Sequence, residues 1–141
     1  MKTERATLGS PIDEVTKKHL QDVLMNLRFE NPILAEAEVG RAVVEIELSQ
    51  PLMNGMGITH GGMLFTLMDM AAGSAVRSLG VTSVTLQSSI NYIRATKEGR
   101  LRAEGQVIHP GRSTVVVHVK ATDSNGKLVA DANFTMYVMD K

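Results

Sequence analysis

The chain contains no cysteine, and this absence removes several kinds of chemistry at once. Disulfides, thiolate metal sites and a cysteine nucleophile are excluded, and a reducing compartment is allowed. The 4 histidines show no metal-ligand spacing with one another, so the sequence predicts no metal centre. The chain also has no Gly-x-Ser-x-Gly segment and no phosphate-loop motif, which argues against a serine hydrolase elbow and a P-loop enzyme.

Net charge is also absent, because 15 Lys and Arg residues balance 15 Asp and Glu residues. Such a chain lacks the broad positive field that attracts nucleic acids or anionic membranes, so we expect neither partner. No run of about 18 apolar residues occurs, so no segment is expected to span a membrane. The polar start MKTERATLGS has no apolar signal-peptide core. We therefore expect a cytoplasmic protein.

What the chain does have is the size and composition of one globular domain. It has 141 residues, of which 43% are hydrophobic and 21% charged, and both fractions are close to globular averages. Division into two domains would leave each half short of core. We find no internal repeat, linker or low-complexity stretch, and we expect a single domain over residues 1–141.

The hydrophobic pattern predicts two helices and six strands. An amphipathic N-terminal helix is expected over about residues 11–28, with Ser10 as N-cap and Pro11 in its first turn. A central apolar helix is expected over about residues 61–79, followed by Gly80. Alternation predicts strands within 33–39, 42–48, 81–96, 101–108, 113–122 and 128–139. A helix this apolar needs burial nearly all round, which a curved antiparallel sheet supplies, so the predicted fold class is α+β.

The segment NGMGITHGGMLFTLMDMAAG, residues 54–73, contains the residues that point to chemistry. Gly61 and Gly62 fall in the first turn of the central helix, where N–H groups lack helical partners and the macrodipole is positive. Without side chains in the way, a ligand oxygen can approach these donors, as an oxyanion hole requires. The alternative is that the glycines let the helix start pack tightly against a strand.

Asp69 is a carboxylate on an otherwise apolar helix, on the same stripe as Gly62, Thr66 and Gly73. Burying a carboxylate without partners is costly, so a residue of this kind needs a reason to be there. The pattern favours a catalytic carboxylate. A charge that reaches solvent at the helix edge, or a structural hydrogen bond, is the alternative.

The spacing of Gly61 and Asp69 has a consequence for assembly. Eight residues of helix separate them by about 12 Å, whereas a base or nucleophile must come within about 3 to 3.5 Å of the reacting atom. One subunit therefore cannot place both groups on the same carbonyl. If they cooperate, the central helices of two subunits lie antiparallel and the dimer contains two equivalent sites.

Two polar residues bracket the loop before the central helix. Asn54 can fix a water molecule or a carbonyl through its amide. His60 can hold the loop by an N-cap-like bond or contact a substrate, and a purely structural role is the alternative for this histidine.

Together these residues resemble the hotdog-fold acyl-CoA thioesterases of the phenylacetate-degradation (PaaI-like) group. The resemblance runs from about residue 30 to the end, and its most specific part is the spacing of Asn54, His60-Gly61-Gly62 and Asp69 within this order of elements. It implies a curved antiparallel sheet wrapped around one long central helix, with the N-terminal helix as an addition. It also implies hydrolysis of an acyl-CoA thioester without a cofactor.

The resemblance implies a role for each residue of the segment. Asp69 would be the catalytic carboxylate, acting as general base on water or as nucleophile on the thioester carbon. The N–H of Gly61 from the neighbouring subunit would bind the thioester oxygen, while His60 and Asn54 shape the loop. On the strand after the helix, Thr85 is the closest match to a residue that assists the water.

Ser83 is the alternative to Thr85 if the strand register differs. The remaining implications of the resemblance concern coenzyme A binding and assembly. Coenzyme A would be held near the subunit interface by basic and backbone groups, for which the matching residues are Gly62, Arg94, Gly111, Arg112 and Ser113. A guanidinium suits a phosphate and a glycine turn exposes N–H groups, although Arg112 also fits a solvated turn. The resemblance implies a homodimer with shared sites and a homotetramer of two such dimers.

Two other functions stay open at this point. One is a non-catalytic acyl-CoA binding or sensing protein on the same fold, which would not need Asp69. The other is a hotdog hydratase or dehydratase, which pairs a catalytic histidine with a carboxylate of the partner subunit. His60 precedes the glycines and lies outside a hydratase-type motif, which disfavours the second.

Overall fold

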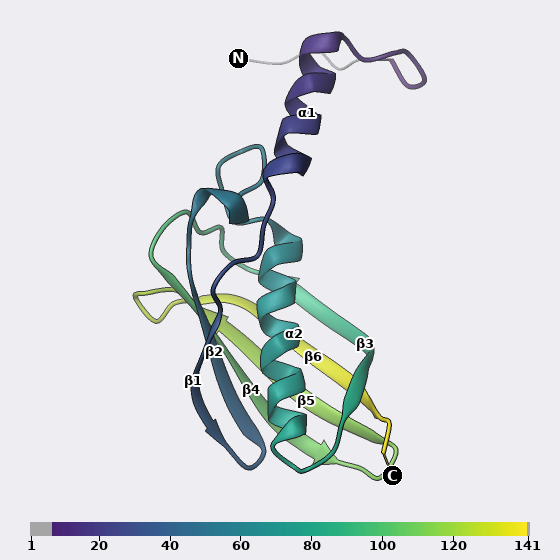
Figure 1. Cartoon of the computed structure of the whole chain (residues 1–141), viewed down its shortest axis with the longest axis vertical. Helices are drawn as coiled ribbons and strands as arrows, with labels where there is room; N and C mark the ends of the chain where they lie inside the picture. Colours follow the sequence, from purple (N-terminus) through teal and green to yellow (C-terminus); the bar gives the residue numbers. More distant parts are fainter. Residues whose placement is uncertain (1–6, 141) are drawn as a thin grey trace.

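A computed structural model describes residues 7–140 and contains one antiparallel sheet with one long helix packed on it (Figure 1). The elements are α1 (Glu14–Asn26), β1 (Ile33–Glu38), β2 (Arg41–Glu47), the 3-10 turn η1 (Gln50–Leu52), α2 (Gly61–Arg77), β3 (Ser83–Tyr92), β4 (Arg100–Pro110), β5 (Thr114–Thr122) and β6 (Leu128–Val138). The strand order is β1-β2-β4-β5-β6-β3. The predicted fold class, an α+β fold with an antiparallel sheet around a central helix, is confirmed.

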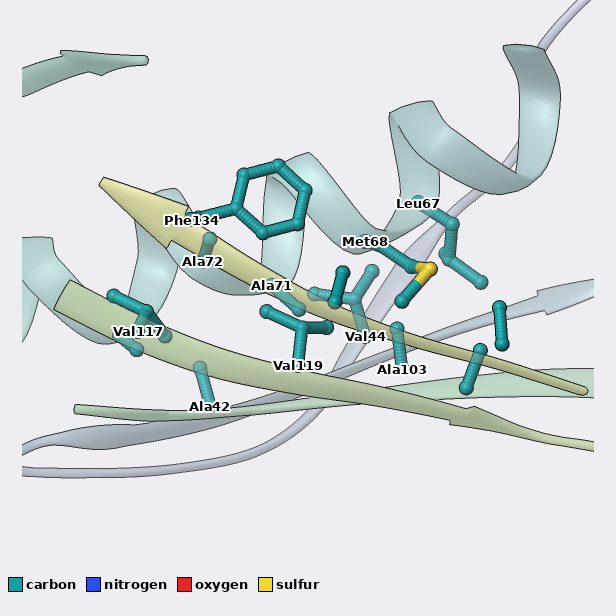
Figure 2. Packing of buried hydrophobic residues seen from close by; sticks show 14 of the residues in the cluster. Ala42, Val44, Leu67, Met68, Ala71, Ala72, Ala103, Val117, Val119 and Phe134 are labelled. Carbon is teal, nitrogen blue, oxygen red and sulfur yellow. The ribbon is translucent and has the colours of Figure 1, made fainter. Parts of the chain in front are cut away.

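Helix α2 is the centre of the molecule because it is apolar on most of its surface. Buried alanines, leucines and a methionine of α2 meet residues from strands β2, β4, β5 and β6, as Figure 2 shows. The labelled members of this core are Ala42, Val44, Leu67, Met68, Ala71, Ala72, Ala103, Val117, Val119 and Phe134. The small side chains let the helix lie close to the sheet.

Helix α2 lies very close to the sheet at Gly105 in β4. A Cβ atom added at this glycine would stand 2.7 Å from the carbonyl oxygen of Ala71, closer than real Cβ contacts. Gly105 is therefore required for packing, and it fixes the distance between α2 and the strand.

Helix α2 ends earlier than the predicted residue 79. Its last residue is Arg77, because Leu79 and Gly80 make turn-type bonds back to the carbonyls of Val76 and Arg77. Gly80 then takes a φ of +90°, which turns the chain towards β3.

The predicted N-terminal helix over 11–28 is shorter in the structure. Helix α1 begins at Glu14, because the carboxylate of Asp13 rather than Ser10 caps it by accepting a bond from Thr16 N–H at 2.7 Å. The helix stands beyond the N-terminal end of α2, away from the sheet (Figure 1), and its apolar Val15 and Leu24 are 81% and 65% exposed. Within residues 7–140, neither helix is long and apolar enough to cross a membrane.

Strand β3 lies at the edge of the sheet and pairs with β6 alone. It ends at Tyr92, so residues 93–96 of the predicted strand are not part of it. The pairing shifts between Thr85 and Gln87, where β3 carries one extra residue. Thr85 then lies opposite Met136 and Tyr92 opposite Ala130, two core residues of β6. Thr85 and Tyr92 consequently both lie on the α2 side of the sheet.

Candidate active site

The loop before α2 is held in shape by Asn54. Its side-chain oxygen accepts hydrogen bonds from the N–H groups of Met56 at 2.9 Å and Ile58 at 3.3 Å. The backbone N–H of Asn54 also donates to the carbonyl of Ile58 at 2.8 Å. These bonds close residues 54–58 into a compact loop, and among the described residues none accepts from the amide Nδ2 of Asn54. That amide nitrogen is available to a ligand or a water molecule.

His60 is the N-cap of α2. Its ring Nδ1 accepts the N–H of Gly62 at 2.9 Å, and its backbone carbonyl accepts from Met63 and Leu64 at 3.0 and 3.1 Å. The bonds from Gly62 and Met63 satisfy two of the donors that a helix start leaves without partners, and the bond from Leu64 is the first regular helical one. Of the two roles expected for His60, the structure shows the capping bond.

The N–H of Gly61 remains a free donor at this helix start. Within residues 7–140, no carbonyl or side chain accepts from it. A Cβ added at Gly61 would meet the ring of Tyr92 at 3.5 Å, an ordinary contact, so packing does not demand a glycine here. At Gly62 the same atom would lie 3.1 Å from the ring of His60, which is tight. The tight neighbour of Gly62 is thus the His60 ring that caps the same helix and not a strand, whereas a free donor at the positive end of the helix fits Gly61.

Gly61 lines a pocket of about 290 Å³. Its lining includes Asn54, Gly61, Leu64, Tyr92 and Arg94. The hydroxyl of Tyr92 donates to the carbonyl of Gly61 at 2.9 Å. Burial raises the pKa of Tyr92 above its ordinary value, so the hydroxyl keeps the proton that it donates.

Asp69 has a close partner on β3. The hydroxyl of Thr85 donates to Asp69 Oδ1 at 2.5 Å. Both residues line an open hollow of about 440 Å³, together with Gly73, Arg77 and Ser83. Ser83 makes no hydrogen bond to Asp69 in the described part of the chain, so the geometry favours Thr85 over Ser83 as the neighbour of the carboxylate.

The Gly61 pocket and the Asp69 hollow are separate and have no lining residue in common. One chain therefore does not bring the free N–H and the carboxylate together. Thr66, between them on α2, donates instead to the carbonyl of Gly62 at 2.8 Å and supports the first turn.

The residues expected to hold coenzyme A are also divided between the two ends of α2. Arg94 lines the Gly61 pocket and Gly62 lies beside it, whereas Gly111, Arg112 and Ser113 form the turn between β4 and β5. The carbonyl of Ser113 accepts the N–H of Val138 at 2.8 Å, and Val138 pairs with Ser83. The turn therefore lies at the end of the sheet that carries the Asp69 hollow.

Among residues 7–140 no group of three histidine, aspartate or glutamate side chains is arranged to hold a metal ion. The polar groups of the Gly61 pocket and the Asp69 hollow are an accepting carboxylate, hydroxyls and backbone N–H donors. Such a set is suited to orienting water and stabilising an oxyanion.

Sequence reasoning did not identify Tyr92 as a site residue. Tyr92 and Thr85 are seven residues apart, and in a regular strand residues at an odd spacing lie on opposite faces. The extra residue in β3 overturns that expectation, and no signal in the sequence announces it.

Comparison with known proteins gives an independent view of this arrangement. The model of the thioesterase superfamily matches residues 56–130. A hypothetical thioesterase of Streptococcus pneumoniae TIGR4, solved with coenzyme A, is 42% identical with a TM-score of 0.77, covering 80% of this chain and 92% of its own. A Streptococcus mutans UA159 protein bound to acetyl-CoA is 41% identical with a TM-score of 0.77, covering 81% and 93%.

A relative named as an enzyme points the same way. The acyl-coenzyme A thioesterase PaaI of Escherichia coli K12 is 32% identical, and the alignment covers 72% of this chain and 79% of PaaI. The fold, the matching family model and these relatives show that the chain belongs to the thioesterase superfamily, in its PaaI-like group of hotdog-fold acyl-CoA thioesterases.

Proposed function

We propose that this protein hydrolyses an acyl-CoA thioester to a free acid and coenzyme A, at active sites shared by two subunits. The observation that carries the proposal is the separation of two complementary half-sites along α2. One holds a free N–H at a helix start, and the other holds a carboxylate with a hydroxyl partner. The relatives that contain coenzyme A or acetyl-CoA support the substrate class.

An antiparallel pair of α2 helices would complete the site. In such a pair the Asp69 hollow of one subunit faces the Gly61 pocket of the other, and the two-fold axis generates a second identical site. The edge strand β3 supports a partner chain, because Val84 and Leu86 on it are 51% and 61% exposed and its outer edge pairs with no other strand of residues 7–140.

In this site Asp69 acts as the general base. It takes a proton from a water molecule that the Thr85 hydroxyl helps to orient, and the water oxygen attacks the thioester carbon. The developing oxyanion accepts the N–H of Gly61 from the other subunit. The tetrahedral intermediate then expels the coenzyme A sulfur, which takes the proton from Asp69. In the second possible role, Asp69 attacks the thioester carbon, the C–S bond breaks and coenzyme A leaves as its thiolate. Water then opens the resulting mixed anhydride at the Asp69 carboxyl, which releases the acid, regenerates the carboxylate and supplies the proton that the thiolate takes up.

Two variants of the pneumococcal relative support the pairing of Asp69 with Thr85. That protein has been crystallised with alanine in place of an aspartate and in place of a threonine sixteen positions further on. Asp69 and Thr85 have the same residue types and the same separation of 16 positions.

Coenzyme A would lie across the same interface. When two α2 helices run antiparallel, the β4–β5 turn of one subunit comes to the same end of the dimer as Arg94 of the other. Gly62, Arg94 and the turn residues Gly111, Arg112 and Ser113 could then bind one phosphorylated ligand between them.

The test is thiol release from a panel of acyl-CoAs by the wild-type protein, by Asp69→Asn and by a matched control, Asp22→Asn. Asp22 is an exposed carboxylate on α1 that pairs with Lys18. We expect Asp69→Asn to reduce release by orders of magnitude, because both a base and a nucleophile need the carboxylate. The control should keep wild-type release.

Circular dichroism and light scattering of each variant establish that folding and assembly are intact. Nearly full turnover by a folded Asp69→Asn protein would overturn the mechanism. Coenzyme A binding without release from any acyl-CoA would instead identify a binding or sensing protein. A single turnover of the wild-type enzyme in ¹⁸O-labelled water distinguishes the two roles of the carboxylate. A general base delivers the label directly to the acid, whereas a nucleophile whose anhydride is opened at the Asp69 carboxyl keeps the label in Asp69 and releases unlabelled acid.

A further inference from the structure

We propose that Tyr92 is a positioning residue for the oxyanion site. It acts by holding the peptide between Gly61 and Gly62, which directly follows the Gly61 N–H. The inference rests on the proposed function and concerns how the free donor is kept in place. Tyr92 is the last residue of β3, and its hydroxyl donates to the carbonyl oxygen of Gly61 at 2.9 Å.

The peptide between Gly61 and Gly62 is held at both ends by side chains. Tyr92 holds its carbonyl, and the ring of His60 accepts its N–H at 2.9 Å. The preceding peptide, between His60 and Gly61, is held at its carbonyl by the N–H groups of Met63 and Leu64. Of the four polar groups in these two peptides, the N–H of Gly61 alone has no partner within residues 7–140.

The reason for such a clamp lies in the glycines. The Gly61 N–H is flanked by the ψ torsion of His60 and the φ torsion of Gly61, and glycine leaves its torsions freer than any other residue, so an unrestrained N–H there would point in many directions. A donor that must reorient during the reaction loses most of its value, because oxyanion stabilisation depends on donors fixed in advance. Tyr92 and His60 supply the restraint that the missing side chains do not.

The ring of Tyr92 adds a second restraint. It lies 3.5 Å from the position of a Cβ atom on Gly61, so it covers one side of this residue at van der Waals distance. Tyr92 also belongs to β3, the strand that carries Thr85 next to Asp69. One strand therefore supports the donor end of α2 and the carboxylate end.

The experiment compares Tyr92→Phe with Tyr137→Phe, which removes the hydroxyl of the second of the chain's 2 tyrosines. Tyr137 is on β6 and does not line either half-site. We expect Tyr92→Phe to lower kcat by about three- to tenfold, since one neutral hydrogen bond is lost, with KM changed by less than about twofold. Tyr137→Phe should match the wild type in both.

A spectroscopic readout separates positioning from general support of the fold. A ketone analogue, with CH₂ in place of the thioester sulfur, binds without being hydrolysed, and its carbonyl stretch reports the strength of the hydrogen bond that it accepts. In Tyr92→Phe the infrared band of the bound analogue should move towards its frequency in water-free solvent, and in Tyr137→Phe it should stay at the wild-type position.

The outcomes separate this inference from the proposed function. A wild-type kcat in Tyr92→Phe, or a reduced kcat with an unchanged carbonyl band, would overturn the positioning role of Tyr92. The proposed function would still stand in that case if Asp69→Asn loses the thiol release of the wild-type protein. Absence of thiol release by the wild-type protein would remove the proposed function itself.

Discussion

Thr85 shows how much one hydroxyl can matter at the residue scale. It lies on a different element from Asp69, and β3 brings its oxygen to 2.5 Å from the carboxylate. A carboxylate that accepts such a bond is restrained in its orientation.

We expect Thr85→Val to lower kcat by about 10- to 100-fold, because a hydrogen bond to a charged group is worth about 1.5 to 3 kcal/mol. Valine has nearly the same shape, so the strand should keep its packing. Thr85→Ser retains the hydroxyl and serves as the control. Steady-state thiol release measures both, and equal rates for the valine and serine variants would contradict the role of the hydroxyl.

The candidate site could be predicted from sequence where a residue type was unusual for its surroundings. A carboxylate on an apolar helix led to Asp69, and glycines at a helix start led to Gly61. The sequence could not decide whether His60 caps the helix or contacts a substrate, because both roles use the same imidazole ring. The structure shows Nδ1 of His60 bonded to Gly62, which fixes the first turn.

At the scale of elements, the contact between α2 and β4 depends on a position without a side chain. We expect Gly105→Ala to lower the free energy of unfolding by about 1 to 3 kcal/mol, because the new methyl group overlaps the carbonyl of Ala71. Urea denaturation at one fixed protein concentration measures the change.

The matched control for Gly105→Ala is Lys120→Ala. Lys120 is exposed on β5 and lies opposite Glu104 in the β4–β5 register, and Glu104 precedes Gly105 in the chain. We expect a change of less than about 0.5 kcal/mol for this surface substitution. If the two variants had the same stability, the close approach of α2 to β4 would be wrong.

The strands were predicted more reliably than their order. Alternation in 101–108 and 128–139 predicted strands there, and the structure buries one of the two alternating sets, which includes Leu101, Ala103 and Phe134. Alternation does not say which strand lies next to which, so the pairing of β2 with β4 and of β3 with β6 came only from the structure. Helix ends were missed where a side chain such as that of Asp13 provided a better cap.

At the scale of the whole molecule, shared sites make a quantitative prediction about mixtures. Gly61→Pro removes the free N–H, and proline is well tolerated at the first position of a helix after an extended residue such as His60, whose φ and ψ are −63° and 131°. Asp69→Ala removes the carboxylate. Each variant alone should be inactive.

Unfolding and refolding the two variants together should restore activity. A mixed dimer has one site with both defects and one site with neither, so random pairing should recover about a quarter of wild-type thiol release. No recovery, although mass spectrometry detects mixed dimers, would show that Gly61 and Asp69 do not serve a common site. Gly61→Ala keeps the N–H and should remain active alone.

Light scattering of the same samples tests the assembly. We expect a mass of two or four times the 15.3 kDa of the chain, the latter for the homotetramer of two dimers. A mass equal to one chain at the concentrations of the assay would contradict a site built from two subunits.

Because β3 carries an extra residue, the number of residues between Thr85 and Tyr92 decides whether both side chains lie on the α2 side of the sheet. Removing any one residue between Thr85 and Tyr92 would restore an uninterrupted pleat, yet it would rotate one of these two side chains to the outer face. Point substitutions at the intervening positions leave both orientations intact. In this strand, the parity of the count between threonine and tyrosine matters more to the site than the identity of the residues that make it up.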